Sequence, residues 1–130
     1  MAVVIAYKYE DQVEPGSALV AGAESGAVAL PGADGAGNFA GIYSSIGNRT
    51  KDKPDTADTL GLTLHGACRV KVSGAVTAFA FGKVADATGA VAELVGAPLA
   101  PTKIPGFFME DGADGELVDF FVEPFLHPGA

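Results

Sequence analysis

Residues 60–72 read Leu-Gly-Leu-Thr-Leu-His-Gly-Ala-Cys-Arg-Val-Lys-Val, a stretch in which apolar side chains recur at every second position. The leucines share one face of an extended chain, and Cys68, Val70 and Val72 share one face further along. This period of two is typical of half-buried β-strands. Arg69 and Lys71 then lie on the opposite face, toward solvent or a partner.

Glycine and proline divide the rest of the chain into short apolar runs without long helical stripes. Val76–Val84 is the one helical candidate, and its Phe-Ala-Phe alternation fits an extended segment equally well. We therefore expect an all-β fold, a small β-barrel or sandwich-like domain with long loops. The expected strands are Val3–Lys8, Ala18–Ala21, Ala27–Leu30, Phe39–Ser44, Thr59–Leu64, Cys68–Val72, Lys83–Asp86, Ala90–Leu94, Phe107–Glu110 and Leu117–Glu123.

Turn and loop residues predict how these strands are connected. Residues 86–89 (Asp-Ala-Thr-Gly) separate two apolar runs and have the turn chemistry of a short hairpin. The acidic segment Glu110–Glu116 predicts a longer hairpin loop. The prolines of Ala97–Pro105 remove backbone donors, so we expect this segment to link strands rather than to lie in a sheet. The Pro-rich tail Pro124–Ala130 has the same character.

Length, composition and charge restrict the class of protein. The 130 residues, 48% of them hydrophobic, fit a single β domain over residues 1–130, with residues 1–10 as an N-terminal arm or strand. The side chains are mostly small, so the core is modest and oligomerisation would help it. The net charge of −8 opposes binding to nucleic acid, where affinity comes from Lys and Arg. The sequence also lacks a signal-peptide pattern and a membrane span, so we expect synthesis in the cytoplasm and no membrane partner.

Few side chains have a pattern that fits catalysis. Cys68 is the single cysteine, which excludes an intrachain disulfide and a thiolate cluster. Its neighbours indicate a small strand residue rather than a reactive thiol. His65, which we place at a strand end, and His127 have no His, Cys or carboxylate nearby at ligand spacing. We therefore expect no enzyme activity, no cofactor and no metal site.

Two glycine-containing segments have an alternative interpretation. The carboxylates of Glu110–Glu116 are hard oxygen ligands of the kind that Ca²⁺ prefers, but their spacing does not match an EF-hand loop. A solvated hairpin loop is the preferred interpretation, and a weak or interfacial calcium site stays open. Gly32–Asn38 lacks the Lys-Ser/Thr ending of a phosphate-binding loop and predicts a turn.

The middle and the end of the chain resemble a known family. Residues 62–74, 81–84 and 87–91 are similar to the central strands of capsid decoration (cement, or head-stabilising) proteins of tailed bacteriophages, and residues 104–109 and 115–122 to their final pair of strands. The resemblance covers roughly residues 60–123, whereas Asn38–Asp58 adds an aromatic-containing strand and a basic loop. It implies a homotrimer on the outer capsid surface of the virion. There it would stabilise contacts between subunits of the major capsid protein lattice.

Two segments are candidates for partner contacts. The N-terminal strand can pair with an exposed sheet edge of a partner, although an internal strand of the chain's own barrel fits equally well. The polar stretch Ile46–Asp58 predicts a surface loop that makes specific contacts. The candidate partner-binding residues are Val3, Val4, Ile5 and Tyr7 in the strand and Arg49, Lys51 and Lys53 in the loop.

Two other functions remain as alternatives. A ligand- or carbohydrate-binding β-module of a virion or cell surface needs exposed aromatic rings, and the chain has no Trp and only three Tyr. A trimeric β-barrel enzyme would assemble its site between subunits. No Asp-containing motif flanked by phosphate-binding Ser or Arg supports that alternative.

Overall fold

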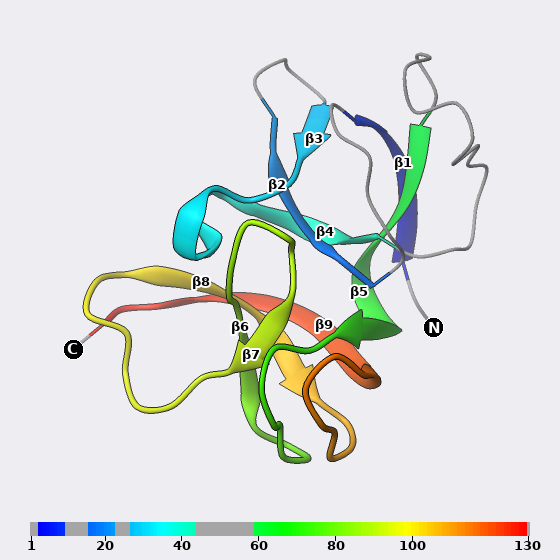
Figure 1. The fold of residues 1–130 in the computed structure, drawn as a ribbon. Coiled ribbons are helices and arrows are strands. Elements are labelled where there is room, and N and C mark those ends of the chain that lie inside the picture. The colour runs from blue at the N-terminus through cyan, green and yellow to red at the C-terminus, as the bar shows by residue number, and fades with distance from the viewer. Residues whose placement is uncertain (1–2, 10–15, 23–26, 44–58, 130) are drawn as a thin grey trace.

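The computed structural model describes residues 3–9, 16–22, 27–43 and 59–129 of the chain. The described residues form strands and a single 3-10 turn, η1 (Ala33–Gly35), so the expected all-β class is confirmed (Figure 1). No described helix is long and apolar enough to span a membrane. The strands are β1 (Val3–Tyr9), β2 (Ala18–Ala21), β3 (Ala27–Ala29), β4 (Phe39–Tyr43), β5 (Thr59–Lys71), β6 (Phe81–Val84), β7 (Val91–Glu93), β8 (Thr102–Phe108) and β9 (Leu117–His127).

The strand pairings form two curled halves that share β5. In the first half β1 pairs with β3, β3 with β2, β2 with β4, β4 with β5, and β5 again with β1, so these pairings close into a ring. All of them are antiparallel except β1–β3. The second half follows the order β5-β9-β8-β6-β7, and a bridge between Val72 and Val91 brings β7 back to the end of β5. Figure 1 shows the first half above and the second below.

Strand β5 joins the halves because it is one long strand rather than the two shorter ones that we expected. Its residues 59–65 pair with β1 and β4, and its residues 66–71 pair with β9. Gly66 lies at this change of partner with φ 109°, a conformation that glycine adopts readily and other residues rarely do. The chain therefore changes sheets without ending the strand, and His65 lies within β5 rather than at a strand end.

Strands β2 and β4 form a layer that is buried on both faces. Ala18 and Ile42 belong to the larger hydrophobic cluster, around Phe120, whereas their neighbours Leu19 and Tyr43 belong to a second cluster. Successive residues of a strand point to opposite faces. A strand covered on both faces therefore needs continuous apolar sequence, as β2 and β4 have, rather than alternation.

Two prolines lie inside strands. The expectation that residues 97–105 link strands rather than lie in a sheet is wrong for residues 102–105, and residues 124–127 of the expected tail belong to β9. Pro105 is in β8 and Pro124 is in β9. The β8–β9 register shifts between Ile104 and Gly106, where Ile104 faces Phe125 and Gly106 faces Val122. Proline is tolerated at such a bulge because the ladder does not require its missing N–H there.

The predicted hairpins are confirmed. Strands β6 and β7 are antiparallel, and residues 86–89 form the turn, in which the Gly89 N–H donates to the Asp86 carbonyl (3.1 Å). The Thr88 hydroxyl donates to the Asp86 carboxylate and lowers the pKa of that carboxyl. Strands β8 and β9 flank the acidic segment 110–116. Of the two alternatives for Val76–Val84, the extended one is correct at its end, since β6 occupies residues 81–84. Gly32–Asn38 contains the 3-10 turn, as the predicted turn requires.

Candidate interaction surface

Two pairs of consecutive phenylalanines place aromatic rings on both faces of the second half. Phe107-Phe108 ends β8, and Phe120-Phe121 lies in β9. Phe108 and Phe120 are fully buried and pack edge to face, with ring centroids 5.1 Å apart. Because neighbours on a strand point to opposite faces, Phe107 and Phe121 are directed outward.

The outward phenylalanines form a row across three neighbouring strands. Phe81 of β6 faces Phe107 of β8, which in turn faces Phe121 of β9. The rings of Phe107 and Phe121 are stacked at 5.5 Å, and Phe125 packs against Phe81 at 5.1 Å. His65 of β5 extends the row, with its ring 5.4 Å from that of Phe121. We call these five residues the aromatic face.

Charged side chains border the aromatic face and pair with each other across strands. Arg69 of β5 faces Asp119 of β9, with its Nε 3.3 Å from the Asp119 Oδ1. The Nε2 of His65 lies 3.9 Å from the Glu123 Oε2. Both pairs are largely exposed, so each adds little to stability. The Arg69–Asp119 pair balances charge locally in a chain of net charge −8.

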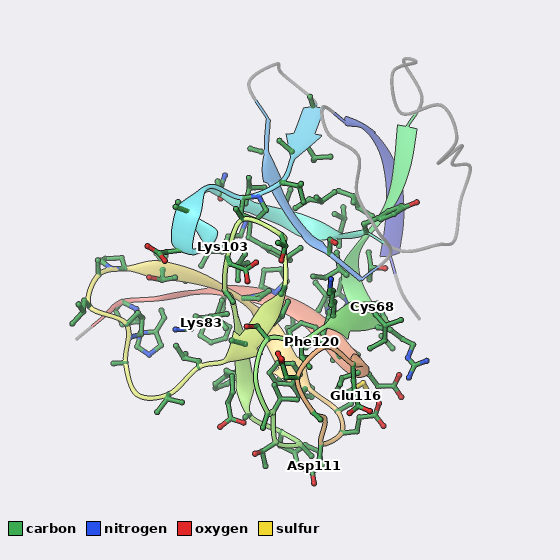
Figure 2. The ribbon with its side chains drawn as sticks, in the orientation of Figure 1. Cys68, Lys83, Lys103, Asp111, Glu116 and Phe120 are labelled. Carbon is green, nitrogen blue, oxygen red and sulfur yellow. The ribbon has the colours of Figure 1, made fainter. Side chains whose placement is uncertain are left out.

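The carboxylates of the acidic segment 110–116 accept hydrogen bonds from backbone amides. Asp111 accepts from the Ala78 N–H (2.8 Å) and Asp114 from the Gly74 N–H (2.7 Å). Glu116 accepts from Ala113 (2.7 Å), and Glu110 from Asp119 (2.9 Å). Figure 2 shows Asp111 and Glu116 at the lower end of the molecule. The segment thereby fastens the neighbouring turn at residues 73–80. No group of three or more His, Cys, Asp or Glu within the described ranges is placed to hold a metal ion.

The Asp111→Ala variant should loosen the turn that this carboxylate holds. Losing one acceptor for an exposed backbone N–H should cost about 1 kcal/mol of unfolding free energy. It should also speed hydrogen exchange of the Ala78 amide, measured by NMR. The Asp111→Asn variant keeps an acceptor oxygen and is the control. Equal exchange of the Ala78 amide in the Asp111→Ala variant and the parent chain would contradict this role.

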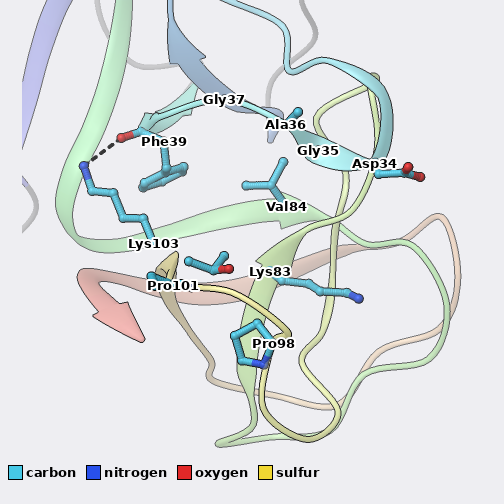
Figure 3. Close-up of a pocket in the computed structure, with 11 residues that line it drawn as sticks. Asp34, Gly35, Ala36, Gly37, Phe39, Lys83, Val84, Pro98, Pro101 and Lys103 are labelled. Atoms are coloured by element: carbon cyan, nitrogen blue, oxygen red, sulfur yellow. Dashed lines mark hydrogen bonds between the residues drawn. The ribbon is translucent and has the colours of Figure 1, made fainter. Parts of the chain in front are cut away.

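A hollow of about 390 Å³ lies between the η1 turn and the β7–β8 connection. Phe39, Val84, Pro98 and Pro101 supply apolar walls, and Lys83 and Lys103 supply cations (Figure 3). The Lys103 Nζ donates to the Phe39 carbonyl oxygen at 2.9 Å, so this ammonium group ties β8 to β4. This hydrogen bond gives Lys103 a structural role within the fold.

Cys68 lies in β5 opposite Phe120 and packs against the larger hydrophobic cluster. Burial, with a smaller contribution from the Asp119 charge, raises the pKa of its thiol to about 12. The thiolate is the reactive form of cysteine, so this thiol is unreactive near neutral pH. The structure agrees with the predicted small strand residue.

The sequence-predicted partner residues lie in β1, where Val3 pairs with His65 of the aromatic face, or outside the described residues. Val3, Val4, Ile5 and Tyr7 are in β1, whose backbone pairs with β5 over Val3–Lys8. β1 belongs to the first half of the molecule, whereas the four phenylalanines of the aromatic face lie on strands of the second half. Arg49, Lys51 and Lys53 fall outside the described residues. Their partner contacts stay a prediction.

Comparisons with known proteins identify a similar fold. No family model matches the chain, and no curated protein sequence matches it. Among solved structures, the head fiber gp8.5 N base of bacteriophage phi29 is similar, with a TM-score of 0.57 and 13% sequence identity. The similarity covers 95% of each chain. At this identity the likeness establishes a shared fold.

Proposed function

We propose that this chain is a structural protein of a tailed-phage head, and specifically a decoration (cement) protein on the outer surface of the assembled capsid. The observation that carries the proposal is the fold shared with a phage head fiber base over 95% of both chains. The sequence resemblance of residues 60–123 to cement proteins supports it independently. In this role the chain is a homotrimer in the virion, does no chemistry and bridges subunits of the major capsid protein.

The physical mechanism is mass action. A protein that binds the assembled lattice, and not its separate subunits, stabilises the lattice by the free energy of its binding. Many copies multiply the effect. The net charge of −8 keeps the protein soluble at high concentration and favours a capsid surface with basic patches.

The proposed contacts to the capsid are the basic residues Arg49, Lys51 and Lys53 and the N-terminal residues of β1. Deleting residues 2–8 would not isolate the contribution of the β1 residues to capsid binding. β1 pairs with β5 and closes the ring of the first half, so its loss would combine weaker attachment with weaker folding. Charge-neutralising substitutions of Arg49, Lys51 and Lys53 leave β1 intact.

The test uses purified phage heads that lack the protein. We expect saturable binding of the parent chain and a rise in the melting temperature of the heads. The triple variant Arg49→Ser, Lys51→Ser, Lys53→Ser should bind about 10-fold more weakly or worse. Its control carries Ala36→Glu, Ala87→Glu and Ala113→Glu at exposed positions, which lowers the net charge by the same amount.

The two parts of the proposal fail separately. A parent chain that binds no head would refute the decoration role. Unchanged binding by the triple Ser variant would refute only the contact through Arg49, Lys51 and Lys53. Equal loss of binding in both triple variants would attribute the effect to net charge and also refute a specific loop contact.

A further inference from the structure

We propose that the aromatic face, formed by His65, Phe81, Phe107, Phe121 and Phe125, is where one copy of this chain docks on another. The outer face of an antiparallel sheet is commonly polar, because it meets water. Here Phe81 is 48% exposed and Phe125 is 36% exposed. Contiguous exposed apolar surface of this kind marks an interaction site.

The arrangement of the rings indicates a protein partner rather than a sugar. Sugars stack on the open face of an aromatic ring. Phe121 is stacked on Phe107 at an interplanar angle of 23° and meets the His65 ring at 82°, and Phe81 meets Phe125 at 63°. The rings are thus largely engaged with each other. Such a cluster fits against another packed apolar surface.

The charges around the aromatic face favour a second copy over a basic partner. Two copies of a chain with net charge −8 repel each other across most approaches. At this face the carboxylate of Asp119 is paired with Arg69. A basic partner would find this carboxylate already compensated, and a second copy would meet less repulsion than an unpaired carboxylate would cause.

The strand pairing of the second half favours contact between the aromatic faces of two copies over pairing of their sheet edges. β5, β9, β8 and β6 each have a described strand on both sides, and the short β7 also meets Val72 through a bridge. Docking by addition of a strand therefore finds few free backbone groups among these strands. Burial of the exposed parts of the phenylalanine side chains would supply the driving force.

The decisive variant is Ala67→Glu. Ala67 is exposed and pairs with Phe121 across β5 and β9, so a carboxylate there places an added negative charge beside Phe121, at the β5 end of the face. Because the position is exposed, the variant should fold normally, and circular dichroism and the melting temperature check this. Ala87→Glu, at an exposed turn position, adds the same charge elsewhere and is the matched control.

Analytical ultracentrifugation of the full chain over a range of concentrations provides the measurement. We expect the parent chain and the Ala87→Glu variant to form the same oligomer. The Ala67→Glu variant should be monomeric, or should dissociate at a concentration about 100-fold higher or more. A monomeric parent chain, or an Ala67→Glu variant that associates like the parent, would overturn the inference.

The inference rests on the proposed function only in that both expect a homo-oligomer. Binding to phage heads separates the two. A monomeric parent chain that binds heads would refute self-association and leave the decoration role intact. A parent chain that forms an oligomer, loses it with Ala67→Glu and binds no head would support self-association and refute the decoration role. An Ala67→Glu variant that keeps its oligomer and loses head binding would assign the face to the capsid and overturn this inference.

Discussion

The Gly106→Ala variant is expected to lose about 4 kcal/mol or more of unfolding free energy. Gly106 lies in β8 at the register shift, with φ 154°. A Cβ at this position would lie 2.0 Å from the carbonyl oxygen of Phe121. That oxygen belongs to β9 between the buried Phe120 and Val122, so relieving the overlap would separate β8 from β9. A loss of this size removes a large part of the stability of a domain of ordinary stability.

The control for this prediction is Gly96→Ala. Gly96 also has a positive φ, 72°, but no atom lies within 4 Å of the position that an added Cβ would occupy. This substitution should cost only the backbone strain of about 1–2 kcal/mol. Urea unfolding followed by circular dichroism measures both variants. Equal losses of unfolding free energy in the two variants would show that the overlap between the added Cβ and the Phe121 carbonyl oxygen does not destabilise the protein.

The second large effect is expected for Phe120→Ala, at about 3–5 kcal/mol. Phe120 is fully buried in the larger hydrophobic cluster and packs edge to face against Phe108. It also approaches Gly82, where an added Cβ would lie 2.8 Å from the Phe120 ring. Truncation would therefore leave a cavity between β6, β8 and β9 that these paired strands cannot readily fill.

The Phe79→Ala variant is the matched control, because it removes the same atoms from a ring that is 79% exposed. The backbone N–H of Phe79 donates to the Phe108 carbonyl (2.7 Å), and the substitution keeps this bond. We expect a change within about 0.5 kcal/mol. Thermal and urea unfolding of both variants test the contrast. A Phe120→Ala variant as stable as Phe79→Ala would mean that the cluster repacks.

The aromatic face had a signal in the sequence. Two adjacent phenylalanines on one strand cannot both be buried when only one face of the sheet meets the core. Phe107-Phe108 and Phe120-Phe121 therefore required an outward ring on each strand. The sequence did not show that Phe107 and Phe121 lie side by side, or that Phe81 lies in the same row. Both depend on the register of strands that are distant in the chain.

The acidic segment 110–116 illustrates the opposite case. Its position between two apolar runs correctly predicted a hairpin loop. The sequence did not indicate that Asp111 and Asp114 accept hydrogen bonds from the backbone of residues 74–78. Those donors are more than thirty residues away, and only the packing of the two loops brings them together.

Local patterns by themselves determined the all-β class, the hairpin at residues 86–89 and the buried faces of β5, since these depend on side-chain period and turn residues. Tertiary structure decided what depends on a partner strand. Gly66 keeps β5 continuous while its pairing changes from β1 and β4 to β9. Pro105 and Pro124 lie within strands because the register shift between β8 and β9 removes the need for their missing N–H groups. The stretch at residues 60–72 therefore specified strand and face, and its neighbours in space decided that it joins the two halves of the fold.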